Sequence, residues 1–221
     1  MPNTPTKGEE LSLLLQLADS ALPTGAFSHS FGLESPIVAG LIGDEDSLQR
    51  WLRSYVETQL LCSEALAMRW IYEGQDPARV HALLAAATVA PQVRLANRRM
   101  GAQLIKLAPQ IDGTLGTAPL QWPEHFALGF ALFGKHLGLD FTVLVQVFLH
   151  SSVTTLMQNA VRAIPLGQLA GQRVLSALRP AIAAAAVKAS TLDEREFGSA
   201  APGLEIAQLR HEHQSMRMFM S

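Results

Sequence analysis

Ser28 and His29 are the adjacent side chains best suited to nucleophilic chemistry in this sequence, a hydroxyl beside an imidazole that could act as its base. Neighbouring side chains point to opposite sides of a strand and lie about 100° apart around a helix, so adjacent residues rarely form a catalytic pair. No G-x-S-x-G turn, which presents the serine of many hydrolases, surrounds Ser28. A small hydrolase with a site around Ser28 is therefore an alternative interpretation and not the preferred one.

The segment around Ser28 is better explained as a shaped turn. Proline fixes one backbone angle, glycines permit a positive φ, an aromatic side chain anchors the segment, and hydroxyls bond to nearby backbone groups. We expect alanine at either glycine to lower stability if that glycine has a positive φ. The residues assigned to this turn are Pro23, Gly25, Phe27, Ser28, Ser30 and Gly32.

Two histidines flank Glu212 near the end of the chain, and imidazole is a good ligand for nickel. In a helix, a spacing of two puts His211 and His213 on different faces, unlike the pair in an H-E-x-x-H site. An extended tail would bring both to one side and allow a weak, accessible nickel site. We favour a tail that docks on a partner, and we assign the chain no metal or cofactor of its own.

The remaining polar candidates have simpler explanations. Arg94 and Arg98 share one helical face beside Arg99, and either solvent or a partner could cover that face. The sequence contains no G-x-x-x-x-G-K-[ST] motif, so we expect no nucleotide binding. Three further histidines stand among apolar residues, where histidine is more often a hydrogen-bonded or half-exposed core residue than a ligand; these are His125, His136 and His150.

Composition narrows the class of protein. The chain has 221 residues, 48% of them hydrophobic and 16% charged, which suits one large domain with a sizeable core. Its net charge of -2 argues against nucleic acid as a partner. The single cysteine, Cys62, excludes an internal disulfide, fits a reducing compartment and is expected to be buried. The polar N-terminus is no signal peptide, and no apolar run approaches the roughly 20 residues of a membrane span, so we expect a cytoplasmic protein.

The elements that must position these residues are predicted to be helices. In the first half the signals are a capping box at Thr6-x-x-Glu9, caps at Asp46 and at Asp76-Pro77, and stops at Gly74 and Pro109. Residues 1–7 are expected to be disordered, and residues 111–123 to form a loop. The predicted helices cover residues 8–20, 46–72, 77–87 and 91–108.

Residues 141–162 are the ambiguous segment of the second half. Alternating apolar residues from Phe141 to Leu149 suit a strand, but the apolar character continues to Val161 and no second strand is available for pairing. We therefore predict a buried helix. The whole chain is predicted to be an all-α, single-domain bundle of eight to ten helices over residues 8–190, a mobile linker over 191–203 and a partner-docking segment over 204–221. The other predicted helices of this half cover residues 124–137, 166–178 and 180–190.

Three segments resemble the UreF family of urease accessory proteins. Residues 14–34 are similar to its N-terminal signature, LPxGxFSHSxGLE in outline; residues 159–173 resemble its AVRxxPLGQxxGQ element; and residues 211–221 resemble its HExQYSRLFRS tail. Ser215 and Met216 stand where the family tail has tyrosine and serine. The matching residues taken as interaction candidates are Pro23, Gly25, Phe27, Ser28, Ser30, Gly32, Glu34, Arg162, Pro165, Gly167, Gln168, Gln172, Arg173, His211, Glu212, Gln214, Arg217 and Phe219.

The resemblance implies an all-helical, non-enzymatic scaffold that forms a homodimer. It also implies a complex with the D-type (or H-type) accessory protein and the G-type nickel GTPase, which promotes nickel insertion into apo-urease and lysine carbamylation. Nickel and GTP would be handled by those partners. A generic helical adaptor unrelated to urease is a further alternative.

Two interaction surfaces are predicted from the matching segments. Arg162, Gln168, Gln172 and Arg173 cluster between two apolar helices, and we expect them at an interface. Residues 204–221 carry methionines and Phe219 after a polar linker, a composition suited to folding onto a partner. We expect Arg217 and Phe219 to be the anchors on the D-type protein. The alternative is that the tail packs back on this protein's own core.

Overall fold

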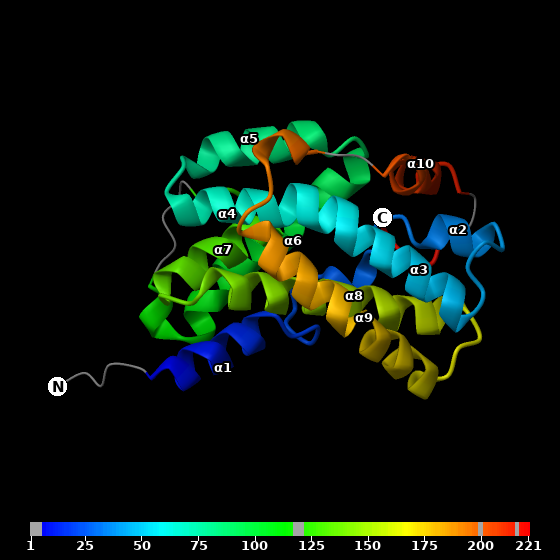
Figure 1. Cartoon of the computed structure of the whole chain (residues 1–221), viewed down its shortest axis with the longest axis horizontal. Helices are drawn as coiled ribbons and strands as arrows, with labels where there is room; N and C mark the ends of the chain where they lie inside the picture. The colour runs from blue at the N-terminus through cyan, green and yellow to red at the C-terminus, as the bar shows by residue number, and fades with distance from the viewer. Residues whose placement is uncertain (1–5, 117–121, 199–200, 215–216) are drawn as a thin grey trace.

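The helical elements follow one another through nearly all of the chain (Figure 1). The structure is a computed structural model, and it describes residues 6–116, 122–198, 201–214 and 217–221. Within these ranges the backbone hydrogen bonds form ten α-helices, one π-helical segment and three short 3-10 turns, and no strand. The prediction of an all-α fold is confirmed.

The first half of the chain builds a long rod and the helices that pack beside it. Its α-helices are α1 (Lys7–Leu17), α2 (Glu34–Val38), α3 (Glu45–Tyr55), α4 (Leu66–Glu73), α5 (Pro77–Ala87) and α6 (Pro91–Ile111). The π-helical segment Val56–Ala65 joins α3 to α4, so that the three form one rod (Figure 1). The prediction of a continuous helix over residues 46–72 is thereby confirmed in outline, with a different internal hydrogen-bond pattern.

Local capping explains where these helices begin. Thr6 and Glu9 form the predicted capping box, so Thr6 and Lys7 belong to the start of α1 and not to a disordered terminus. Asp44, and not Asp46, caps α3: its carboxylate accepts a hydrogen bond from the Ser47 amide at 2.8 Å. The sequence offers two acidic candidates two residues apart, and Asp44 is the one whose backbone amide can donate in return to the hydroxyl of the residue three positions on, Ser47.

The second half contains α7 (Phe126–His136), α8 (Phe141–Ala163), α9 (Gln168–Ala189) and α10 (Pro202–His211). The predicted break between residues 178 and 180 is wrong, because α9 continues through Pro180. Pro109 likewise lies inside the last turn of α6. Proline costs about 3 kcal/mol in a helix interior. In α9 the buried residues on both sides of Pro180, from Leu178 to Ile182, pack against the bundle and outweigh that cost.

Helix α8 is the central element of the bundle. It packs along α9 over most of its length and also contacts α1, α2, α3, α4 and α7. Its buried residues recur at helical spacing, which confirms the prediction of a buried helix over residues 141–162. Among the described helices only α8 is long and apolar enough to cross a membrane, with a mean hydropathy of 1.2. Its packing on six other helices identifies it as a core helix.

Residues 191–198, expected to lie in a mobile linker, make specific contacts with α4. The Arg69 guanidinium donates a hydrogen bond to the Leu192 carbonyl at 2.8 Å and lies 3.2 Å from the Glu73 carboxylate. The Phe197 ring lies against Trp70, with ring centroids 4.7 Å apart. The mobility of this segment stays a prediction, but its described residues are held by a buried arginine and an aromatic contact.

We predict that Arg69→Gln will loosen residues 191–198. Glutamine is shorter than arginine and has no guanidinium group, so it cannot donate to the Leu192 carbonyl. The buried carbonyl then loses its hydrogen-bond donor, at a cost of about 1–3 kcal/mol. Hydrogen exchange should become faster in residues 191–198 and in the end of α9, and the melting temperature should fall. Arg53→Gln is the matched control, because Arg53 is a half-exposed arginine on α3 with one long ion pair to Glu57. Equal exchange in both variants would contradict the assignment.

Candidate functional site

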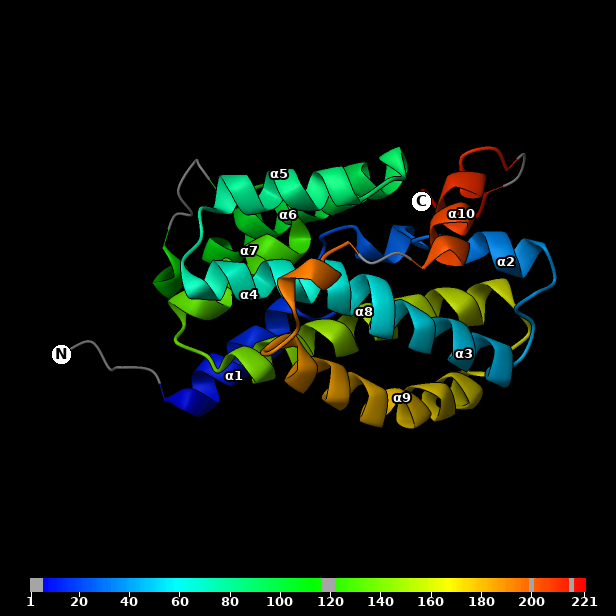
Figure 2. The ribbon, with the colours of Figure 1, turned by 45° about the horizontal axis from the view of Figure 1, so that its top comes forward.

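Residues from all three segments singled out in the sequence meet at one place, beside α2 and α10 (Figure 2). The turn that follows α1, the C-terminal end of α8 and the last residues of the chain contact one another there. We call this place the motif junction. It consists of Phe27, His29, Ser30, Glu34, Asn159, Arg162, Gln208, His211, Phe219 and Ser221.

The N-terminal turn is shaped by positive φ angles. Gly25 and Gly32 both have φ 89°, and Phe31 between them has φ 50°. A short 3-10 turn at Ala26–Ser28 carries Phe27 outward, while His29 and Ser30 turn inward and are buried. The predicted turn is therefore present, and only glycine adopts two of its conformations without strain.

Glu34 joins this turn to the end of the chain. Its carboxylate is buried and accepts hydrogen bonds from the amides of Met218 at 2.5 Å and Phe219 at 3.2 Å. The His211 Nε2 lies 2.8 Å from the same carboxylate. A buried carboxylate needs such partners, because an unpaired charge away from water is very costly. The last residues of the chain are thus part of this protein's own core.

Ser221 is held by the backbone of the turn. Its main-chain oxygen accepts hydrogen bonds from the amides of Ser30 at 2.5 Å and Phe31 at 3.0 Å, and from the Ser30 hydroxyl at 2.6 Å. The Ser221 hydroxyl lies 2.9 Å from His29 Nδ1. One residue earlier, the Met220 amide donates to the Ser28 carbonyl at 2.8 Å. Together with Glu34, these bonds hold residues 218–221 against the turn, with a bend of the backbone at Met218 and Phe219.

The end of α8 contributes two side chains. The Asn159 amide group donates to the His29 carbonyl at 2.8 Å and is fully buried. The Arg162 guanidinium lies over two rings, 4.4 Å from the centroid of Phe27 and 5.4 Å from that of Phe219. Because cation–π attraction adds to the packing of the two rings, Arg162 links the N-terminal turn to the tail.

Gln208 of α10 is a junction residue that the sequence did not single out. Its side chain donates to the Phe31 carbonyl at 3.3 Å and to Gln59 Oε1 at 2.8 Å, and its own carbonyl accepts from Gln92. Gly32 lies directly against it: a Cβ on Gly32 would be 2.7 Å from Gln208 Cγ. No sequence motif surrounds Gln208, and its partners are more than 100 residues away in the sequence, so local patterns do not predict these contacts. Asn159 and Ser221 were within the matching segments but were not proposed as site residues.

The junction does not assemble a catalytic pair at Ser28. His29 faces Ser221, and no hydrogen bond between His29 and the Ser28 hydroxyl occurs among the described residues. Burial lowers the pKa of His29 to about 4, helped by the charges of Arg99 and His211. Such an imidazole is a weak base, and both it and Ser221 are closed off from solvent. The arrangement positions backbone and does not present a nucleophile.

The two tail histidines do not share a face. His211 is fully buried against Glu34, whereas His213 is exposed after the end of α10. In the described part of the chain no three His, Cys, Asp or Glu side chains gather as a metal site would require. Glu212 is exposed and Gln214 is half-buried. Ser215 and Met216, where the family tail differs, lie outside the described residues.

The central segment is only partly joined to the junction. Pro165, Gly167, Gln168, Gln172 and Arg173 are exposed at the start of α9, beside the exposed Leu169, and Arg173 forms an ion pair with Glu45 of α3. They lie on the surface as an interface would require. The other candidates lie outside the junction. Arg94 donates to backbone carbonyls and Arg98 forms an ion pair with Glu124. His136 and His150 are exposed, whereas His125 and Cys62 are buried.

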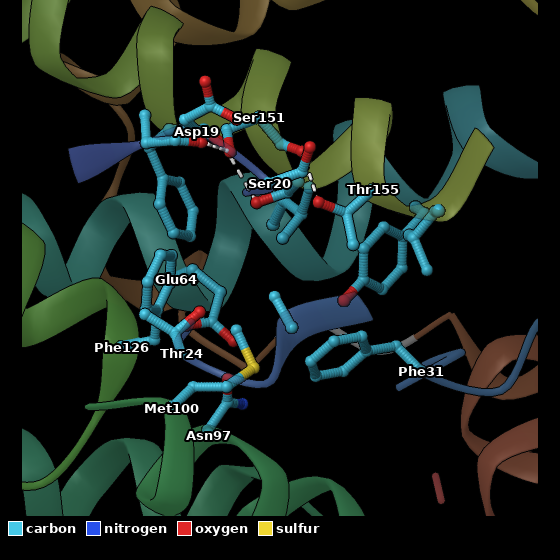
Figure 3. A pocket seen from close by; sticks show the side chains of 17 residues that line it. Asp19, Ser20, Thr24, Phe31, Glu64, Asn97, Met100, Phe126, Ser151 and Thr155 are labelled. Atoms are coloured by element: carbon cyan, nitrogen blue, oxygen red, sulfur yellow. Dashed lines mark hydrogen bonds between the residues drawn. The ribbon is translucent and has the colours of Figure 1, made fainter. Parts of the chain in front are cut away.

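A small cavity of about 40 Å³ lies beneath the N-terminal turn (Figure 3). Polar side chains enter a mainly aromatic and aliphatic wall. That volume is enough for about three water molecules, since a water needs roughly 10–15 Å³ by this measure. The polar lining includes Thr24, Tyr55, Glu64, Asn97, Ser151 and Thr155.

Glu64 is the titratable group of this cavity. Burial raises the pKa of its carboxyl group to about 8, and its Oε2 has no hydrogen-bond partner among the described residues. The imidazole of His125 lies next to it, with Nε2 at 3.8 Å, and burial lowers the pKa of that imidazole to about 3. Near neutral pH, both groups are therefore uncharged, and the pair is no ion pair. Burial raises the pKa of Tyr55, and the nearby carboxyl group of Glu64 raises it further.

The fold and the junction define an all-helical protein in which the distinctive residues position chain segments and leave other side chains exposed. The model of the UreF family matches residues 42–179. "Urease accessory protein UreF" of Arthrobacter sp. (strain FB24) is 44% identical over 94% of this chain and 96% of its own length. The proteins of the same name from Paenarthrobacter aurescens (strain TC1) and Corynebacterium glutamicum (strain R) are 43% and 41% identical, over 94% and 95% of this chain and 96% and 97% of their own. The chain belongs to the UreF family of urease accessory proteins.

We predict that Gly32→Ala will destabilise the protein more than Gly25→Ala. Both glycines have φ 89°, so both substitutions introduce backbone strain of about 1 kcal/mol. Only at position 32 would the new Cβ also meet Gln208, whereas nothing lies within 4 Å of it at position 25. Overpacking adds about 1–3 kcal/mol. Chemical denaturation of the two variants measures the difference, and equal losses would show that Gly32 and α10 are not in close contact.

We also predict that Glu64→Gln will change how stability depends on pH. The pKa of Glu64 is raised from 4.5 to about 8 in the folded protein, so stability falls as pH rises from about 4.5 towards 8. The slope is at most about 1.4 kcal/mol per pH unit. The variant should lose this slope and be more stable than the wild type at pH 8. Glu57→Gln, an exposed residue of the same π-helical segment, should keep it. The lowered pKa of His125 makes stability fall as pH drops, and this effect is confined to pH values below about 6.5.

Proposed function

We propose that this protein is a non-enzymatic scaffold that acts with the D-type (or H-type) accessory protein and the G-type GTPase in inserting nickel into apo-urease. The name of its relatives, urease accessory protein, supports the process. The observation that carries the scaffold role is the motif junction, where buried hydrogen bonds fix the tail while its apolar side chains Met218 and Met220 stay exposed. The proposal includes a cytoplasmic homodimer that leaves nickel and GTP to its partners.

The tail alternates between inward and outward side chains. Phe219 and Ser221 are buried against the turn, while Met218 and Met220 are 54% and 53% exposed. Buried and exposed side chains thus alternate along residues 218–221, with a bend of the backbone at Met218 and Phe219. The predicted anchor Phe219 is thus not free to bind a partner, because it packs under Arg162 in this protein's own core. Arg217 remains exposed.

The outward side chains form the surface that we assign to partner docking, and we call it the tail face: Phe27, Arg217, Met218 and Met220. Phe27 is exposed beside Arg162, and the two methionines are exposed on the tail. Methionine adapts its shape to a partner, and aromatic residues and arginine are enriched at binding hot spots. Because the tail is already ordered, binding through this face avoids much of the entropy cost of folding a free segment.

The test separates docking from folding by changing only outward residues. We expect the double variant Met218→Glu/Met220→Glu to keep its melting temperature, and to lose co-purification with the D-type protein and the activation of urease. Val187→Glu, an equally exposed apolar residue on α9, is the matched control and should keep both. Truncation at residue 211 is unsuitable, since it removes the buried side chains of His211, Phe219 and Ser221.

A second variant, at the buried Phe219, tests the packing of the tail on this protein's own core. Phe219→Ala should lower stability by about 3–5 kcal/mol, because it empties a buried aromatic position. If Met218→Glu/Met220→Glu still captures the D-type protein as well as the wild type does, the tail face is not the docking surface. If the wild-type chain captures neither the D-type nor the G-type protein, the scaffold proposal is wrong, and the generic adaptor or the hydrolase is the better interpretation.

A further inference from the structure

A surface pocket lies between α5 and α6, formed by residues that take no part in the motif junction. Its volume is about 290 Å³, and it is lined by His81, Ala85, Thr88, Arg94, Leu95, Arg98 and His125. Two arginines and two histidines thus face a space with aliphatic side chains on its other walls. Such a lining combines hydrogen-bond donors with a site for a few methylene groups.

The two arginines have donors to spare. Arg94 uses Nη1 to bond the carbonyls of Thr88 at 2.5 Å and Val89 at 3.0 Å. Arg98 uses Nε to bond Glu124 Oε2 at 2.7 Å. Their other N–H groups have no protein acceptor within the described ranges. Glu124 is the acidic residue paired at this pocket, so two guanidinium groups face one carboxylate and the local charge is positive before the histidines are counted.

His125 supplies a buried and unpartnered polar atom. The residue is 4% exposed, and its Nδ1 has no hydrogen-bond partner among the residues described. The opposite ring nitrogen, Nε2, faces Glu64 at 3.8 Å. That contact is too long for a hydrogen bond, so Nδ1 is free to carry the ring proton of the neutral imidazole. With the proton on Nδ1, His125 is a donor that still needs an acceptor. A buried donor left alone is unusual and calls for a partner.

We propose that this α5–α6 pocket binds a carboxylate group. The free N–H groups of Arg94 and Arg98 match the two oxygens of a carboxylate, and the imidazole N–H of His125 gives a further donor at the inner wall. Ala85 and Leu95 cover the adjoining methylene groups. A glutamate side chain of a partner protein and a small free dicarboxylic acid present the same chemistry. A phosphate dianion fits less well, because Glu124 remains beside the arginines and repels a second negative charge.

The experiment uses four probes with the full-length protein, one of which is inorganic phosphate as a competing anion. Sodium glutarate represents a free acid, a capped peptide with the sequence Ala-Leu-Glu-Leu-Ala represents a partner's side chain, and the same peptide with glutamine in place of glutamate is its uncharged counterpart. Imidazole ¹H–¹⁵N spectra report on His81 and His125, and calorimetry measures affinity. We expect shifts of both histidine signals with glutarate or with the glutamate peptide, and none with the glutamine peptide. Preference for the peptide over glutarate identifies a protein partner, and the reverse identifies a free acid.

Variants then test the arginines. Arg98→Gln should weaken binding by about tenfold, the value of one charge-assisted hydrogen bond. Arg179→Gln, an exposed arginine on α9, is the matched control and should bind as the wild type does. Because Arg94 also holds the turn before α6, Arg94→Gln is used only if its melting temperature is unchanged. Absence of binding by both charged probes, equal binding by the glutamine peptide, tighter binding of inorganic phosphate, or equal affinity in Arg98→Gln and Arg179→Gln would each overturn the proposal. None of these outcomes bears on the tail face, which shares no residue with the pocket lining.

Discussion

The arrangement of the motif junction depends on one buried carboxylate. Glu34 stands at the first position of α2, with two backbone amides of the tail and His211 of α10 as its partners. Leaving a buried polar group without its hydrogen-bond partner costs about 1–3 kcal/mol, and more where the group is charged. Through these bonds, Glu34 fixes α10 and residues 218–221 relative to the N-terminal turn. Segments from opposite ends of the chain are folded as one unit.

This constraint explains how the tail can be fixed in place and still present exposed side chains. Bonds from Glu34, Ser30 and His29 hold the inward side of residues 218–221, so the outward side is presented in a fixed conformation. Arg162 closes the assembly by covering both Phe27 and Phe219. The two sequence hypotheses for the tail, self-packing and docking, thus refer to its two sides. Self-packing describes Phe219 and Ser221, and docking stays a proposal for Met218 and Met220.

Local signals in the sequence predicted most of the helices, because capping boxes, prolines after caps and apolar periodicity act over four or five residues. They placed α1, α5 and α8 well, and they identified the turn glycines Gly25 and Gly32. They failed where distant packing decides the outcome. Pro180 lies inside α9 because the helix is held against α8, and residues 191–198 are held by Arg69 of α4. Gln208 could not be recognised at all, since its partners lie in three other elements.

The π-helical segment Val56–Ala65 is the feature that connects the junction to the cavity beside it. In an α-helix, residues five apart lie about 140° apart around the axis. Hydrogen bonds of the i→i+5 type instead place them one turn apart on the same face. Gln59 and Glu64 have this spacing, and both line the small space next to Gln208. Gln59 is thereby directed to Gln208 in the junction, while Glu64 reaches His125 and the cavity under the N-terminal turn. An ordinary α-helix through this segment would separate the two side chains, so the wider turn is what lets one rod support both sites.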